Sequence, residues 1–166
     1  MQQTPKEWNK YDSVLVKALS VNNTKLSKIL KHGKQNILNN PSILFNKKNI
    51  TVKVHFDMYH GYGNLDKAIN LIKKKDREEF RRYVKINNTF NPHIMCVAKP
   101  KILKLWFNDL FLWLKKCEVV FGFKDLKGYD TTRLYAYLAE RYHSYWFKKY
   151  SNYVEWPYKF IDTEKN

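Results

Sequence analysis

The spacing of apolar residues along the chain predicts short strands and several helices. Residues 12–17 are apolar and β-branched, and residues 50–56 alternate between apolar and polar, so each segment predicts a short strand. From Asn64, which can cap a helix, apolar residues recur every three or four positions. This spacing predicts one helix that continues through the charged segment 73–85 and ends at a turn cluster at 87–92.

The next two segments are more apolar. Residues 93–99 predict a short strand that is buried on both faces and stopped by Pro100. Residues 101–118 are apolar on nearly every side of a helix, which predicts a helix in the centre of the fold.

A last long helix and a terminal strand complete the pattern. Asp130 and the threonines after it can cap this helix, whose predicted buried stripe is Leu134, Leu138, Tyr142, Tyr145 and Trp146. Residues 153–162 predict an edge strand, because Pro157 cannot donate to a β-ladder. We therefore expect an α+β fold that is dominated by helices and contains a few short strands.

The length of 166 residues predicts a single domain, residues 1–166. Its Asn- and Lys-rich segment 1–50 is expected to be weakly ordered. No stretch approaches the roughly 18 apolar residues of a membrane span, and the first residues lack the apolar centre of a signal peptide. We therefore expect a cytoplasmic chain in which Cys96 and Cys117 are reduced thiols.

The formal charge of +16 leaves two explanations open. The first is that the positive charge serves to bind an anionic partner such as nucleic acid, a lipid surface or a phosphorylated substrate. However, only five of the 31 basic residues are Arg, and Asn, Ile, Tyr and Phe are abundant, a composition typical of AT-rich genomes. Zinc-finger spacing, an aromatic RNA-binding motif and a phosphate-binding Gly-Lys loop are absent from the sequence, so nucleic acid is not the favoured partner.

Two groups of polar residues suggest chemistry. His55, Asp57 and His60 lie close together, but their spacing matches no zinc signature, and we assign no metal ligand. Arg133 and Glu140 are seven residues apart and therefore share one face of the last helix. They could form an internal ion pair, or they could contact a diphosphate, and the spacing does not separate these alternatives.

Three segments resemble a family of bacterial capsular and O-antigen glycosyltransferases long catalogued as a domain of unknown function. Residues 51–69 resemble the family's segment of a polar–aromatic pair, a His and Asp-Leu-Asp. Residues 90–114 resemble its strand-then-helix around Asn-Met-Phe-Ile, with Ile94 in place of the Asn. Residues 129–146 resemble its last helix most specifically, through Tyr129, Arg133, Leu138, Glu140, Arg141 and Trp146. The family-like core is residues 51–162.

The resemblance implies the C-terminal part of a GT-A-like, Rossmann-type enzyme that transfers a hexose from a nucleotide sugar to a surface polysaccharide. It implies His60 and Glu140 as catalytic residues, and Arg133, Arg141, Tyr137 and His55 as substrate-binding residues. Arg133 would meet the diphosphate charge and Glu140 would orient it or contact an acceptor hydroxyl. The resemblance leaves open whether a divalent metal such as manganese serves as a cofactor, although the sequence contains no Asp-x-Asp.

Family members carry a preceding half with the first Rossmann-like strands. This sequence begins near the family's strand Tyr-Asp-Val-Ile-Leu-Pro, which appears here as Tyr-Asp-Ser-Val-Leu-Val-Lys at residues 11–17. Two expectations follow: a truncated or inactive transferase, or a second chain that supplies the other half. The basic surface favours peripheral association of the protein with anionic lipid at the inner face of the membrane. The alternative from another class is a non-catalytic protein that binds nucleic acid or another polyanion.

Overall fold

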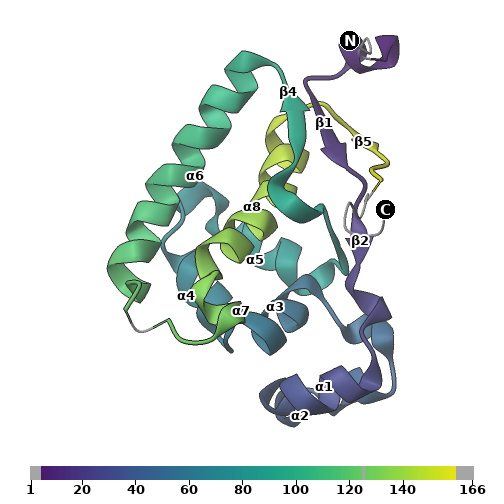
Figure 1. The fold of residues 1–166 in the computed structure, drawn as a ribbon, viewed down its shortest axis with the longest axis vertical. Coiled ribbons are helices and arrows are strands. Elements are labelled where there is room, and N and C mark those ends of the chain that lie inside the picture. Colours follow the sequence, from purple (N-terminus) through teal and green to yellow (C-terminus); the bar gives the residue numbers. More distant parts are fainter. Residues whose placement is uncertain (1–4, 125, 160–166) are drawn as a thin grey trace, which may run out of the picture.

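A three-stranded sheet contains both the first and the last strand of the fold (Figure 1). In this computed structural model, which describes residues 5–124 and 126–159, β1 (Ser13–Val16) is the central strand. It pairs antiparallel with β4 (Cys96–Ala98) and parallel with β5 (Tyr153–Trp156). The predicted strand at 12–17 is therefore confirmed, and the predicted terminal strand lies at the sheet edge over residues 153–156. Residues 160–162 of that prediction lie outside the described residues.

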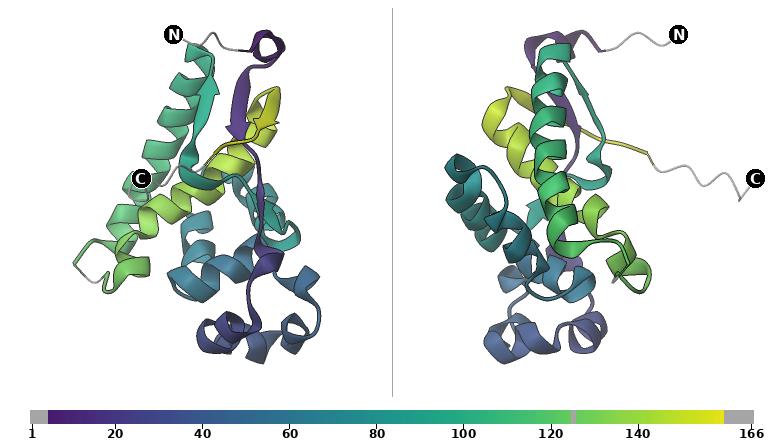
Figure 2. Two further views of the ribbon diagram at one scale, coloured as in Figure 1. Left: turned by 45° about the vertical axis from the view of Figure 1, so that its right-hand side comes forward. Right: turned by 90° about the vertical axis from the view of Figure 1, so that its left-hand side faces the viewer.

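Helices dominate the described residues and surround one long central helix, α8 (Figures 1 and 2). The α-helices are α1 (Leu26–His32), α2 (Lys34–Asn39), α3 (Val52–His60), α4 (Asn64–Asn70), α5 (Lys74–Ile86), α6 (Pro100–Phe121), α7 (Tyr129–Thr132) and α8 (Leu134–Tyr150). The short elements are the 3-10 helices η1 (Lys6–Lys10), η2 (Val21–Asn23), η3 (Pro41–Leu44), η4 (Lys47–Asn49) and η5 (Pro92–Ile94), with the paired strands β2 (Leu19–Ser20) and β3 (Thr89–Phe90). The expected helix-dominated α+β class is confirmed.

The core forms around α8, as its apolar stripe predicts. All five stripe residues are buried, and Trp106 of α6 packs its ring against those of Tyr142 and Trp146 at centroid distances of 5.5 and 5.4 Å. The side chain of Asp130, the predicted cap, is outside the described side chains. The residue before α8 is Arg133, which makes no capping hydrogen bond with its side chain.

The predicted strand at 50–56 is wrong, because most of this segment forms the start of α3. Thr51 caps α3 by accepting a hydrogen bond from the backbone N–H of Val54, at 3.3 Å. Gly61, with φ 92°, follows its last residue. The alternating apolar residues also satisfy a helical spacing, since Val52 and Phe56 are four apart and both buried. The Thr cap and the terminal Gly are the signals that distinguish a helix here.

The predicted continuous helix from Asn64 is also wrong, since α4 and α5 are separate helices. Lys73 adopts an extended conformation with ψ 135°, which interrupts the helical backbone before α5 begins. The N-cap of α4 is Gly63 rather than Asn64, whose side chain instead donates to the carbonyl of His60 at 3.0 Å.

Two predictions of burial are wrong as well. The strand predicted at 93–99 shrinks to β4, an edge strand in which Val97 is 54% exposed. The helix predicted at 101–118 is α6, and it flanks the fold rather than passing through its centre, as the right-hand view of Figure 2 shows. Trp106 and Trp113 face the core, whereas Phe107 and Phe111 are about half exposed. None of the described helices has both the length and the apolar content needed to cross a membrane.

Candidate functional site

Five of the six residues proposed from the sequence line one pocket. This pocket, which we call the α3–α8 pocket, has a volume of about 590 Å³. Its walls come from the segment 19–28, from α3, from the segment 90–93 and from the first half of α8. The residues brought together are His55, His60, Tyr137, Glu140 and Arg141.

Helix α3 supplies three aromatic side chains to the pocket wall. His55 and Tyr59, four residues apart, share one face of α3. His60 lies about 100° further round the helix from Tyr59 and lines the same pocket. The ring of His60 stacks on that of Tyr137 from α8, with centroids 3.7 Å apart and an interplanar angle of 18°. His55 lies 5.0 Å from the ring of Tyr59. This wall therefore offers flat aromatic faces beside polar ring nitrogens.

Helix α8 supplies the charged residues of the pocket. The Arg141 side chain is 1% exposed, forms an ion pair with Glu140, and lies with Cζ 3.8 Å from the ring centroid of Phe90. Its Nη2 is 3.4 Å from Nδ1 of His55, and its Nε is buried without a hydrogen-bond partner. Arg141 thus connects Glu140 to His55 across the pocket floor.

The charge of this cluster is set by burial and by Arg141. Burial lowers the pKa of His55 to about 3, and the neighbouring Arg141 cation adds to the effect. His55 is therefore neutral at pH 7 and can accept a hydrogen bond at one ring nitrogen. Burial also lowers the pKa of Arg141, while the ion pair with Glu140 opposes this change.

A strained backbone segment holds Glu140 from the other side. The backbone N–H of His93 donates to Oε1 of Glu140 at 2.7 Å. His93 and Ile94 have φ of 66° and 54°, in the left-handed region that a β-branched residue such as Ile strongly disfavours. Strained residues of this kind persist where the surrounding structure fixes them, and they concentrate at binding and catalytic sites.

Asn91 fixes this segment in place. Its side chain is fully buried, and Nδ2 donates to the carbonyl of Val16 at 2.7 Å and to Glu155 at 2.9 Å. Its backbone N–H donates to the hydroxyl of Ser144 on α8, also at 2.7 Å. The strained wall of the pocket is therefore tied to the sheet and to α8 at once.

Searches against protein-family models, curated proteins and solved structures find no match to this chain. The function of the pocket must therefore be inferred from its own residues.

The sixth predicted residue, Arg133, does not line the pocket. It is exposed at the start of α8, with its guanidinium carbon 5.6 Å from the ring centroid of Tyr137. The ion pair that the sequence left open between Arg133 and Glu140 is replaced by one between Arg141 and Glu140. Residues seven apart share a face but lie two turns from each other, whereas the neighbour reaches the same carboxylate.

The sequence analysis missed the basic and strained side of the pocket. Lys25, Lys28 and His93 also line it, and the two lysines are exposed at the start of α1. Nothing in their local pattern distinguishes Lys25 and Lys28 from other lysines of the Lys-rich first segment. His93 precedes the position where the resemblance indicates an Asn, a residue that tolerates the left-handed region, and this was an available signal.

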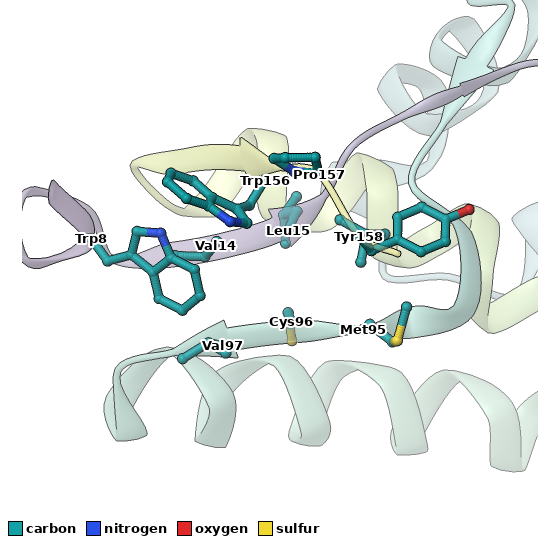
Figure 3. A pocket seen from close by; sticks show the side chains of 10 residues that line it. Trp8, Val14, Leu15, Met95, Cys96, Val97, Trp156, Pro157 and Tyr158 are labelled. Atoms are coloured by element: carbon teal, nitrogen blue, oxygen red, sulfur yellow. The ribbon is translucent and has the colours of Figure 1, made fainter. Parts of the chain in front are cut away.

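A second hollow lies at the sheet, between β5 and β4 (Figure 3). Its volume is about 180 Å³, and apolar side chains such as Trp8, Trp156 and Met95 surround it. Cys96 also lines it, but burial raises the pKa of this thiol to about 11, so it is protonated at pH 7 and a weak nucleophile. This hollow carries no acid–base pair.

Among the side chains that the structure describes, no three from His, Cys, Asp or Glu gather as a metal site would require. Asp57, between the two pocket histidines in sequence, pairs instead with Lys53 and accepts the backbone N–H of Gly63 at 3.2 Å. Cys96 and Cys117 are both free thiols, as expected.

Proposed function

We propose that the α3–α8 pocket binds the hexosyl part of a nucleotide sugar, and that the chain is a domain of a glycosyltransferase for surface polysaccharide. The observation that carries this proposal is the convergence of His55, His60, Tyr137, Glu140 and Arg141 on one pocket. These residues were selected from two separate segments, on the resemblance and on their polarity among aromatic residues, and segments so far apart in the sequence need not meet.

The size and chemistry of the pocket support a sugar. Ligand pockets for small molecules range from about 300 to 1,000 Å³ and combine apolar surface with a few placed polar groups. The pocket is lined by the ring of Tyr59, against which the C–H face of a hexose can pack, and by the stacked rings of His60 and Tyr137. Glu140 and His60 supply hydrogen-bonding groups for sugar hydroxyls.

The charges suggest separate roles for the polar residues. Lys25 and Lys28 at the edge of the pocket would meet the diphosphate of the donor, in place of the role inferred for Arg133. Arg141 is enclosed and paired, so we assign it to positioning Glu140 and His55 rather than to the phosphates. Glu140 is the candidate for contact with the acceptor hydroxyl.

A thermal-shift titration with nucleotide sugars tests the proposal. At about a hundred times its Kd, a donor should raise the free energy of unfolding by about 2.7 kcal/mol. Lys28→Gln should weaken this effect several-fold, since it removes a charge at the pocket edge. Lys31→Gln is the matched control, because Lys31 is also exposed on α1 but does not line the pocket.

His60→Gln should abolish the stabilisation by removing the ring that stacks on Tyr137. If that variant does not fold, the comparison of Lys28 with Lys31 still decides. The absence of stabilisation by any nucleotide sugar or free hexose would contradict the proposal, as would an equal loss in both lysine variants. Salt-sensitive retention on DNA in its place would support the polyanion alternative.

A further inference from the structure

Helix α6 turns an unusual number of apolar side chains outward. It exposes six large apolar residues, more than any other described element: Leu105, Phe107, Phe111, Leu112, Val119 and Val120. The rings of Phe107 and Phe111 stack on each other at 5.9 Å, with both side chains about half exposed. Contiguous exposed apolar surface of this kind marks an interaction site on most proteins.

The same face of α6 is basic. Lys101, Lys104, Lys115 and Lys116 are all exposed. The acidic residue in the middle of the helix, Asp109, turns inward and pairs with Lys73 and with the indole N–H of Trp146, leaving Glu118 as the outward acid of α6.

Lysines and apolar residues share one surface of the helix. Lys104 and Lys115 are about three turns apart and nearly aligned. Phe107 and Phe111 flank this line on one side, and Leu105 and Leu112 flank it on the other. We call the surface formed by these six residues the α6 outer face. In the right-hand view of Figure 2, α6 is the nearest element and no other segment covers it.

We propose that the α6 outer face binds the surface of an anionic lipid bilayer. Helices that lie in a bilayer surface combine embedded aromatic and aliphatic side chains with Lys or Arg beside anionic headgroups. A second copy of the chain fits this face less well, because pairing two such faces would oppose their lysines. A bilayer surface neutralises the lysines and accepts the apolar side chains without requiring a matching shape. No residue of α6 lines the α3–α8 pocket, so this inference does not depend on the proposed function.

Vesicle co-sedimentation tests the inference directly. The probes are vesicles of phosphatidylcholine alone and of equal parts phosphatidylcholine and phosphatidylglycerol. The wild-type chain should bind the anionic vesicles, and binding should weaken with salt. Replacing Phe107 and Phe111 together with Gln should lower the partition coefficient at least about tenfold, since apolar area no longer leaves water. The matched control is Phe45→Gln, because Phe45 is 88% exposed but lies outside α6.

A lysine pair gives an independent readout. Replacing Lys104 and Lys115 with Gln should lower partitioning about fivefold for each lysine, which is equivalent to about 1 kcal/mol each. Replacing Lys47 and Lys48 removes the same charge from another exposed segment and should have a much smaller effect. If the variant without Phe107 and Phe111 has a lower melting temperature, the comparison of the two lysine pairs alone tests the inference.

Three results would overturn the inference. They are no binding to anionic vesicles, equal losses in the α6 variants and their controls, and a dimer in light scattering that dissociates when Phe107 and Phe111 are replaced. The last result would assign the face to a second copy of the chain.

Discussion

The strained residue Ile94 allows a sharp test of the pocket geometry. Gly is normally less stable than Ala in an ordered segment by about 0.5–1 kcal/mol, because it loses more conformational freedom on folding. In the left-handed region a side chain with a Cβ costs about 1–2 kcal/mol more than Gly does. At φ 54° the cost of the Cβ exceeds the entropic cost of Gly. Gly should therefore be more stable than Ala at this position, the reverse of the usual order.

We therefore expect Ile94→Gly to be more stable than Ile94→Ala by about 0.5–1 kcal/mol. Both variants lose the apolar contacts of the half-buried Ile94 side chain, so the difference between them isolates the backbone. Ile94→Asn should also retain more stability than Ile94→Ala, since Asn tolerates this conformation. The measurement is urea unfolding at pH 7 with a common slope for all variants.

Ile37 is the matched control position. It is also half buried, but it lies in α2 with a right-handed backbone, so Ile37→Gly should be less stable than Ile37→Ala by about 1 kcal/mol. If Ala and Gly keep the same order at positions 94 and 37, the left-handed strain at the pocket wall does not exist in solution.

Three further predictions concern buried polar groups. Burial lowers the pKa of His55 to about 3 and that of His143 to about 4, against 6.5 in the unfolded chain, so the unfolded state binds more protons between these values. The free energy of unfolding should therefore fall as the pH drops below about 6.5, by up to about 1.4 kcal/mol per pH unit for each His; a flat profile in urea unfolding between pH 7 and 5 would contradict this. His143→Leu should remove one of these contributions and raise stability at pH 7 by about 1–3 kcal/mol, because both His143 ring nitrogens are buried without partners; a lower melting temperature would argue that the ring has a partner. Asn91→Leu should cost about 2–4 kcal/mol by removing the hydrogen bonds from the buried Asn91 amide to the Val16 carbonyl and to Glu155, and a loss below about 1 kcal/mol in chemical denaturation would refute that anchoring role.

The sequence correctly predicts those elements whose spacing of apolar residues fits only one type of secondary structure. The stripe of α8 is confirmed residue by residue, because its apolar positions fit only a helical period. The alternation in 50–56 fits both periods, and the choice of a strand was wrong since Thr51 and Gly61 decide for a helix. The helix at 101–118 was predicted to lie in the centre of the fold because apolar residues occur on nearly every side of it. Several of them are exposed in α6, and periodicity alone cannot distinguish a buried apolar face from an uncovered one.

The candidate site was only partly predictable for a different reason. Helical spacing places Tyr137 and Glu140, three residues apart, on one face of α8 once that helix is known. His55 and His60 are five residues apart and do not share a helix face, so spacing alone did not predict that both line the pocket. Whether an Arg meets a carboxylate or stays exposed depends on packing between helices, so spacing did not show that Arg141 rather than Arg133 pairs with Glu140. The lysines of the segment 19–28 enter the pocket through tertiary contacts that no local pattern records.

The pairing of β1 with β5 has a consequence for the order of folding. The central strand of the sheet is translated before nearly all other described elements, but its parallel neighbour is residues 153–156. Until those residues have been translated, β1 keeps one edge unpaired and open to non-native strand pairing. The helices can form from local contacts well before then, whereas the sheet must close a loop of more than a hundred residues. We therefore expect sheet closure to be the late and slow step, and shortening the chain before Tyr153 to leave a helical but aggregation-prone intermediate.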